Sequence, residues 1–276
     1  LTSTIPCESC AFTLDLRESR RRKPLSVPKL KGLVAIVNGA SRGIGAAIAK
    51  GYALEGAKVV VAARTEEPHP RLPGTIHSVK AEINEAGGEA TAIKCDISVE
   101  EEVQRLVDQT LSEYGKIDVV VNNAAVMITG RPVVDTEARH FLLGLRVNLL
   151  GPFLLSKYAL PGMMERRSGS IINIGSGAAL SRNPGGSNYA STKAGLERFT
   201  IVLAEETREY NIAVNCLDPG PIKSEAAEML QPADHNWASY SLPKAVAPSA
   251  IFLAVQDAKS FTGQIVHRVE FRRSWP

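Results

Sequence analysis

The sequence predicts an α/β protein with one parallel sheet. Apolar segments of strand length alternate with segments of helical periodicity, as in consecutive βαβ units. The first such strand leads directly into a glycine-rich turn and a helix, and later strands end in polar or turn-forming residues. A chain of 276 residues suits one large domain better than two small ones.

The composition is that of a soluble globular protein, with 44% hydrophobic and 22% charged residues. A net charge of +3, from 32 basic and 29 acidic side chains, is too balanced to indicate a nucleic-acid partner. No apolar run reaches the roughly 18 residues that a membrane span needs. We therefore expect a cytoplasmic protein that acts on a small molecule, without nucleic acid or membrane as a partner.

The N-terminal segment differs from the rest of the chain. Residues 1–28 lack hydrophobic periodicity and are predicted to be a flexible tail before a domain at residues 29–276. A targeting segment is an alternative, but the acidic residues of this region fit an acid-poor transit peptide badly. Cys7 and Cys10 form a C-x-x-C pair, yet no second Cys/His pair completes a zinc site, and no metal is predicted.

The first strand of the domain is the apolar run 33–37, which has the composition of a strand buried on both faces. The turn 38–45 follows, and residues 46–55 have a helical pattern. In such a unit, the backbone N–H groups of a glycine-rich turn can approach a pyrophosphate at the positive end of the helix. The G-x-x-x-G-x-G spacing differs from the general dinucleotide fingerprint. The strand–turn–helix context nevertheless favours nucleotide binding over a purely structural turn.

The second predicted strand, 58–63, ends before Arg64 and Thr65. A site that prefers NAD places an acidic residue near this position to bind the ribose 2′-hydroxyl. Here Ala63 supplies no carboxylate, while Arg42 and Arg64 offer guanidinium groups suited to a phosphate. We therefore predict NADP (NADPH) as the cofactor. The alternative is that both arginines are ordinary surface charges.

The next unit comprises a helix at 75–86 and a strand at 90–95 that ends at Asp96. Ser98 begins a capping-box pattern for a helix that runs to about Tyr114. Asp96 has two interpretations of equal weight. It could accept a hydrogen bond from an adenine amino group, or it could cap the loop.

Three further strands are predicted at 117–121, 170–175 and 212–217. Their carboxyl ends carry an Asn-Asn-Ala-Ala segment, Ser176, and the rigid Asp-Pro-Gly-Pro turn that begins at residue 218. In parallel sheets ligands bind beyond the carboxyl ends of the strands, where these residues gather. Between them, Asn148 lies in an apolar helical stretch, where the usual role of an Asn is to satisfy a buried backbone group.

Tyr189 and Lys193 are four residues apart and therefore lie on one face of a helix. A lysine charge favours phenolate, so we predict that Lys193 lowers the pKa of the Tyr189 phenol from about 10 toward the working pH. Such pairs also occur by chance on exposed helices. The interpretation as an acid–base pair therefore depends on Ser176 and on the nucleotide-binding features described above.

Taken together, these motifs resemble the short-chain dehydrogenase/reductase family from about residue 29 to residue 271. The glycine turn, Asn-Asn-Ala, Val-Asn, Ser, Tyr-x-x-x-Lys and Pro-Gly occur in the order and spacing of that family. The resemblance implies a three-layer α/β/α Rossmann fold on a doubly wound, seven-stranded parallel sheet. It implies an NADP-dependent oxidoreductase that interconverts a ketone or aldehyde and an alcohol by hydride transfer. It also implies a homodimer or homotetramer built on the two long helices near 148–164 and 189–209.

The resemblance further assigns residues. The catalytic residues would be Asn148, Ser176, Tyr189 and Lys193. The residues expected at the cofactor are Gly39, Ser41, Arg42, Gly43, Ile44, Gly45, Arg64, Thr65, Asp96, Ile97, Asn123, Ala124, Tyr189, Lys193, Pro219, Gly220, Ile222 and Ser224.

These residue types fit the chemistry. Hydride arriving at a carbonyl carbon builds negative charge on the oxygen, which Ser176 can bind while Tyr189 delivers a proton. Lys193 would tune Tyr189 and hold the ribose hydroxyls, and Asn148 would anchor a water that resupplies protons.

The sequence departs from the family pattern at several places. Asn38 replaces the usual Thr, but we expect it to hydrogen-bond a neighbouring loop in the same way, and Ala125 replaces a Gly. Residues 263–271 fit the last strand but lack the usual Asp-Gly-Gly ending. The loop at 67–76 is lengthened and is similar to a segment of hydroxysteroid dehydrogenase-like proteins.

Residues 224–242 are predicted to form a lid over a hydrophobic substrate, because they include Met229, Leu230, Trp237 and Tyr240. Ordinary packing is the alternative.

The sequence offers two alternative functions: a catalytically silent nucleotide-binding regulator, and a non-redox relative such as a halohydrin lyase. The intact Ser, Tyr and Lys count against the silent regulator. Halohydrin lyases have Arg in place of the Lys and lack the glycine turn, whereas this sequence keeps both the Lys and the turn.

Overall fold

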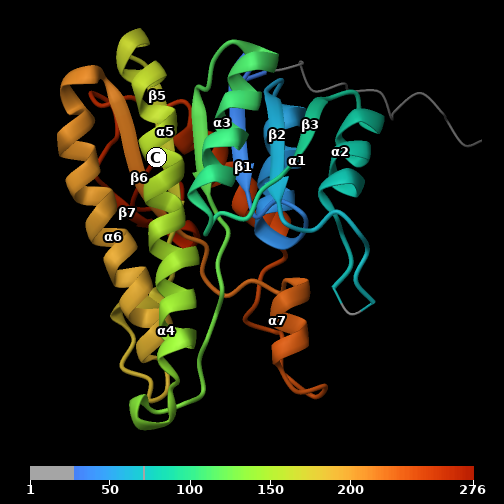
Figure 1. The fold of residues 1–276 in the computed structure, drawn as a ribbon, viewed down its shortest axis with the longest axis vertical. Coiled ribbons are helices and arrows are strands. Elements are labelled where there is room, and N and C mark those ends of the chain that lie inside the picture. Colours follow the sequence, from blue (N-terminus) through green and yellow to red (C-terminus); the bar gives the residue numbers. More distant parts are fainter. Residues whose placement is uncertain (1–27, 71) are drawn as a thin grey trace, which may run out of the picture.

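The computed structural model describes residues 28–70 and 72–276. All but the last residue of the predicted tail, with Cys7 and Cys10, lies outside them. Seven parallel strands form one sheet in the order β3-β2-β1-β4-β5-β6-β7 (Figure 1), which confirms the predicted doubly wound α/β fold. The strands are β1 (Val34–Asn38), β2 (Lys58–Ala63), β3 (Glu89–Lys94), β4 (Val119–Asn122), β5 (Gly169–Ile174), β6 (Ile212–Asp218) and β7 (Ile265–His267).

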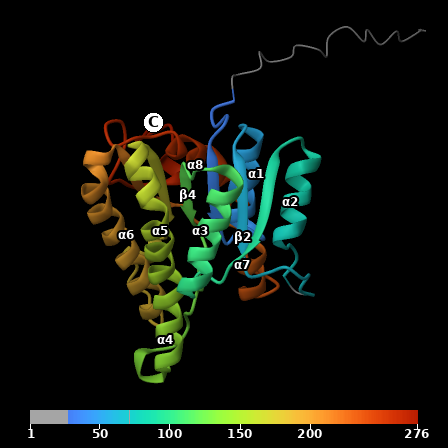
Figure 2. The same ribbon diagram turned by 45° about the horizontal axis from the view of Figure 1, so that its top comes forward.

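Helices cover both faces of the sheet, as Figures 1 and 2 show. Helices α1, α2 and α8 pack with one hydrophobic cluster, and α3, α5 and α6 pack with the other. The helices are α1 (Gly43–Leu54), α2 (Ile76–Glu85), α3 (Glu100–Tyr114), α4 (Ala138–Leu145), α5 (Gly151–Arg166), α6 (Ser187–Thr207), α7 (Glu225–Leu230) and α8 (Ala247–Ala254). Among the described residues no helix is both long and apolar enough to cross a bilayer.

The central strands are apolar throughout because they are covered on both faces. In β1, Ala35 and Val37 belong to the cluster beneath α1, while Ile36 belongs to the cluster beneath α3 and α5. All three side chains are fully buried. This explains the unbroken hydrophobic runs that predicted the strands.

Two predicted boundaries were wrong. The helix expected from Ser98 begins at Glu100, and its N-cap residue, Val99, provides no side-chain cap. Ser98 instead donates from its backbone nitrogen and its hydroxyl to Asp96 Oδ1, at 2.9 and 2.7 Å. The last strand is only three residues long, because the chain turns into a short 3-10 helix at Arg268–Glu270.

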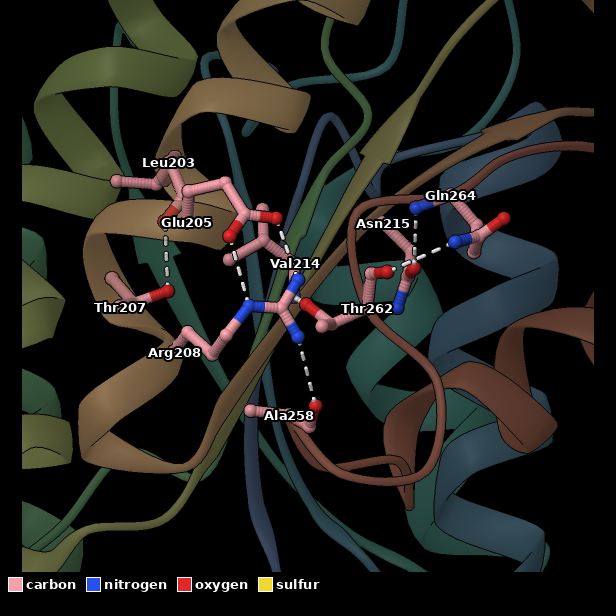
Figure 3. Close-up of polar contacts among 9 residues, drawn as sticks. All are labelled: Leu203, Glu205, Thr207, Arg208, Val214, Asn215, Ala258, Thr262 and Gln264. Atoms are coloured by element: carbon pink, nitrogen blue, oxygen red, sulfur yellow. Dashed lines mark hydrogen bonds and ion pairs between the residues drawn. The ribbon is translucent and has the colours of Figure 1, made fainter.

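Strand β7 lies at the edge of the sheet, and side chains fix its position. Val214 N donates to Thr262 Oγ1 at 3.0 Å, and Gln264 N donates to Asn215 Oδ1 at 3.1 Å (Figure 3). In the same view, Arg208 at the end of α6 bridges Glu205 and the carbonyl of Ala258. These contacts hold the segment before β7 in register with β6.

The segments that leave the carboxyl ends of β4 and β6 lead to α4 and α7. Both helices lie beyond the same end of the sheet, at the bottom of Figure 1. Between α4 and α5, residues Arg146–Leu150 form one π-helical turn, a feature that is frequent at functional sites. The polar residues identified in the sequence therefore gather at this end.

Candidate active site

The turn after β1 is held against the end of β4 by close backbone contacts. Gly39 has φ +66°, and a Cβ there would lie 2.7 Å from Ala124 Cα. A Cβ on Gly45 would lie 2.4 Å from the Gly39 carbonyl oxygen. The Asn123 side chain donates to the carbonyls of Asn38 and Gly39 at 3.1 and 3.0 Å. Only glycine fits at both positions.

A chain of buried amides extends from this turn across the sheet. Asn38 Nδ2 donates to Asn122 Oδ1 at 3.1 Å, and Asn122 Nδ2 donates to Asn173 Oδ1 at 2.8 Å. Asn173 in turn donates to Thr200 Oγ1 on α6 at 2.8 Å. Asn38 Oδ1 also accepts from the backbone nitrogens of residues 123 and 124. The expectation that Asn38 hydrogen-bonds a neighbouring loop is confirmed.

A cavity of about 280 Å³ lies beyond the carboxyl ends of β1, β2 and β4. The cavity is lined by residues that follow β1, β2, β3 and β4 and by residues at the start of α7. The predicted cofactor residues among them are Gly39, Ser41, Arg42, Gly43, Ile44, Arg64, Thr65, Asp96, Ile97, Asn123, Ala124 and Ser224. The sequence analysis did not assign Val126, Val147 or Glu225 to this cavity, although they also line it. The predicted Gly45, Tyr189, Lys193, Pro219, Gly220 and Ile222 are not among its lining residues.

The two predicted phosphate-binding arginines are held differently. Arg42 donates from Nε to the Pro73 carbonyl and from a terminal nitrogen to the Gly74 carbonyl, at 3.1 and 2.9 Å. The lengthened loop after β2 therefore orients this guanidinium. Arg64 is 61% exposed and lies 3.5 Å from Asp96 Oδ2.

Asp96 caps its loop, as one of its two interpretations predicts. Burial acts to raise the pKa of its carboxyl, but hydrogen bonds from Ser98 and the charge of Arg64 outweigh burial and lower it. Asp96 also lines the cavity, so its position fits the other interpretation as well.

Ser176 and Tyr189 face each other. Ser176 follows β5, and its hydroxyl accepts from Ala178 N at 3.2 Å, which leaves its proton available. Ser176 also acts to lower the pKa of the Tyr189 phenol, so the two side chains lie near each other. Tyr189 lies in the first turn of α6, so β5 and α6 bring the two hydroxyls together.

Lys193 is 2% exposed and donates from Nζ to the Ile174 carbonyl at 2.7 Å. Its Nζ lies 5.6 Å from the centroid of the Tyr189 ring. Burial lowers the pKa of Lys193 to about 8.

The prediction that Lys193 lowers the pKa of Tyr189 was wrong for this structure. Burial raises the pKa of the phenol, the hydrogen bond from Ser176 opposes the rise, and the negative charge of Asp218 adds to it. Desolvation dominates because Lys193 is buried and Tyr189 is partly buried, and each loses solvation of its charged form.

Asn148 is fully buried in the π-helical turn. Its Oδ1 accepts from Val126 N at 2.8 Å, and its Nδ2 donates to Val126 O and to Thr192 Oγ1 at 2.9 and 3.0 Å. The structure thus shows an Asn that satisfies buried backbone groups. It joins the cavity wall at Val126 to the helix that carries Tyr189.

The segment predicted as a lid is a loop with its two ends joined. Ser241 N donates to Pro221 O at 3.0 Å, and Lys223 N donates to Ser241 O at 2.9 Å. Ser224 caps α7 and lines the cavity. Trp237 and Tyr240 pack on each other with ring centroids 4.9 Å apart. The lid stays a prediction.

Two residues at the ends of β6 and β7 were not among the predicted site residues. Asp218 is 4% exposed, and its Oδ2 lies 2.8 Å from His267 Nδ1. The signal for Asp218 was a carboxylate at the carboxyl end of a buried strand, directly before the Pro-Gly turn. No cluster of three or more potential metal ligands occurs within residues 28–70 and 72–276.

Comparison with known proteins agrees with this geometry. The family model described as short chain dehydrogenase matches residues 33–235. The chain belongs to the short-chain dehydrogenase family. The chain is 36% identical to hydroxysteroid dehydrogenase-like protein 2 of Danio rerio over 86% of its own length. The chain spans only 57% of that relative's length.

Other relatives of this short-chain dehydrogenase are matched over nearly their full length. A 2-dehydro-3-deoxy-D-gluconate 5-dehydrogenase of Formosa agariphila is 32% identical over 86% of the chain and 91% of the relative. The crystal structure of a metagenomic short-chain oxidoreductase in complex with NADP is 33% identical, with a TM-score of 0.73. That alignment covers 87% of this chain and 98% of the other.

The pKa of Lys193 leads to a prediction about stability. Its folded value of about 8 is below the 10.5 of an exposed Lys, so between these values the unfolded chain binds more protons than the folded chain. The penalty for burying the ammonium is fully present below about pH 8 and disappears as the pH rises to about 10.5. Relative to Lys193→Met, the wild-type free energy of unfolding should therefore rise by about 3 kcal/mol across this window. Urea denaturation of both proteins at several pH values measures it, and a constant difference would contradict the assignment.

Proposed function

We propose that the protein is an NADP-dependent oxidoreductase that interconverts a ketone or aldehyde and an alcohol by hydride transfer. The observation that carries the proposal is the Ser176–Tyr189 hydroxyl pair with Lys193, at the same edge of the sheet as the glycine-lined cavity. Family membership supports the reaction type. The NADP in the metagenomic structure supports the choice of cofactor.

The cavity fits a dinucleotide phosphate. Helix α1 begins at Gly43 without a side-chain cap and without an acidic residue in its first turn, so its N-terminal N–H groups are available to an anion. Gly39 and Gly45 keep this surface free of side chains, and Arg42 and Arg64 add positive charge. When bound, NADPH would supply the hydride.

The protein's own groups would handle the proton. Ser176 would donate to the substrate oxygen and fix its direction, while Tyr189 would donate a proton to that oxygen as negative charge develops. Lys193 would hold the ribose hydroxyls. For alcohol oxidation, Tyr189 would act as the base.

The loop beside the cavity supports a hydrophobic substrate. Met229 and Leu230 on α7 are 40% and 51% exposed. They would contact a hydrophobic carbonyl compound when α7 closes. One relative named above is called hydroxysteroid dehydrogenase-like, and the other is named as a dehydrogenase of a sugar acid. A panel that includes both classes would separate them.

The catalytic proposal predicts that Tyr189→Phe loses most turnover but still binds NADPH, because only the acidic hydroxyl is removed. A loss of two or more orders of magnitude in kcat is expected. Consumption of NADPH absorbance with a panel of ketones and aldehydes measures turnover, and cofactor fluorescence measures binding. Full activity in Tyr189→Phe would refute the assignment of the acid.

The cofactor proposal predicts different effects on the two nicotinamide cofactors. Arg42→Leu and Arg64→Leu should each raise KM for NADPH about tenfold or more, with little change for NADH, because each loses a charge-assisted bond to the 2′-phosphate. Arg139→Leu, which removes an exposed Arg on α4, is the matched control. An equal effect on NADPH and NADH would show that neither Arg reads the phosphate.

We also propose that the protein is a homodimer or homotetramer. Helices α4, α5 and α6 and the π-helical turn present an apolar groove lined by Leu142, Leu145, Leu149, Leu150, Phe153 and Phe199. Phe153 is 44% exposed, which is costly for a large aromatic unless a second copy covers it.

This interface predicts that Phe153→Glu produces a monomer, since a charge would be buried without a partner. Light scattering after size exclusion measures the mass. Val134→Glu is the control, because Val134 is 90% exposed and lies outside the groove. An unchanged mass in Phe153→Glu would show that these helices are not the interface.

A further inference from the structure

Sheet pairing brings Asp218 and His267 together. The parallel register of β6 and β7 places these residues opposite each other, and Asp218 Oδ2 lies 2.8 Å from His267 Nδ1. The bond from Gln264 N to Asn215 Oδ1, visible in Figure 3, fixes that register. Trp275 Nε1 also donates to the His267 carbonyl at 2.9 Å. Their contact is therefore a consequence of the fold.

The two partners differ in exposure. The Asp218 side chain is 6% exposed, whereas that of His267 is 45% exposed and reaches solvent. A carboxylate only accepts hydrogen bonds, so Nδ1 of His267 must carry a proton even in the neutral ring. The second oxygen of Asp218 accepts from Gly220 N at 2.8 Å. Both carboxylate oxygens are thus fixed in place.

This buried carboxylate lies beside the proposed catalytic residues. A Cβ on Gly177 would be 3.4 Å from Asp218 Oδ2, so the carboxylate packs against the residue that follows Ser176. Its negative charge acts on Tyr189 in the direction that opposes phenolate, in addition to the larger effect of burial. Other ionisable groups face the same region from three elements: Lys193 and Glu197 of α6, Cys216 of β6, and Arg268 after β7.

We propose that Asp218, held by His267, is a positioning residue that sets the pH at which Tyr189 changes from proton donor to proton acceptor. The proposal rests on the proposed function for the role of Tyr189. A fixed negative charge near a phenol disfavours phenolate, so carbonyl reduction, which needs the phenol, persists to higher pH. Asp218 acts on Tyr189 through its charge, and it also holds the Pro219–Gly220 turn.

The test is a spectroscopic titration of Tyr189 that needs no substrate. Phenolate absorbs in the ultraviolet, and the chain has six tyrosines, so subtracting the titration of Tyr189→Phe from that of the wild type isolates Tyr189. The same pair of measurements is made with Asp218→Asn in both proteins. We expect phenolate to form at lower pH with Asp218→Asn, while circular dichroism shows that the fold persists. An unchanged midpoint would overturn the proposal.

Matched variants separate a specific effect from a general loss of charge. Glu197→Gln also removes a nearby carboxylate, yet it should leave the Tyr189 midpoint in place; an equal shift would contradict a specific role for Asp218. His267→Asn keeps an N–H donor for Asp218 and should retain the wild-type midpoint. His267→Ala lacks that donor and should shift the midpoint toward that of Asp218→Asn. If His267→Ala also matches the wild type, His267 has no part in holding the carboxylate.

The kinetic readout follows from the same shift. In Asp218→Asn, the pH above which kcat for carbonyl reduction falls should move down with the phenol titration, while KM for NADPH stays near its wild-type value. A fall in kcat at all pH values without a shift in the profile would indicate a structural role only. Absence of turnover in the wild type would refute the proposed function, and the titration would still decide whether Asp218 controls Tyr189.

Discussion

The buried amide network is the interaction on which the geometry of this site depends. It begins at Asn38, beside the glycine turn, crosses β4 and β5 through Asn122 and Asn173, and reaches Thr200 on α6. Each amide is buried, so each must find its partner or lose about 1–3 kcal/mol. The glycine turn and the helix that carries Tyr189 are therefore held relative to each other by buried groups that all have hydrogen-bond partners.

Desolvation, more than attraction between opposite charges, governs the electrostatics near Tyr189. Burial opposes both the phenolate of Tyr189 and the ammonium of Lys193, so the phenol stays protonated and the pKa of Lys193 falls to about 8. A neutral phenol is a proton donor, which is the state that carbonyl reduction requires. A bound dinucleotide brings phosphates and a nicotinamide ring, and these change the balance of charge that the protein alone establishes.

Much of the fold could be predicted from the sequence because its signals are local. Strands buried on both faces have unbroken apolar runs, and glycines at the turn reflect a backbone contact that excludes any Cβ. The errors had a local and a tertiary cause. Ser98 hydrogen-bonds the carboxylate of Asp96, two residues before it, and does not cap the helix. Lys193 is buried by tertiary packing and donates to the Ile174 carbonyl, where burial disfavours its charge. Asp218 and His267 are 49 residues apart, and only the register of an edge strand shows that they meet.

The joined ends of the loop that carries α7 have a mechanical consequence. Because Pro221 and Lys223 are hydrogen-bonded to Ser241, the loop cannot open at one end like a hinged arm. Displacement of α7 must instead rotate the whole segment about the hydrogen-bonded residues Pro221, Lys223 and Ser241. Ser224 lies beside these hydrogen-bonded residues and lines the cavity beyond β1, so such a rotation would move part of the cavity wall together with α7.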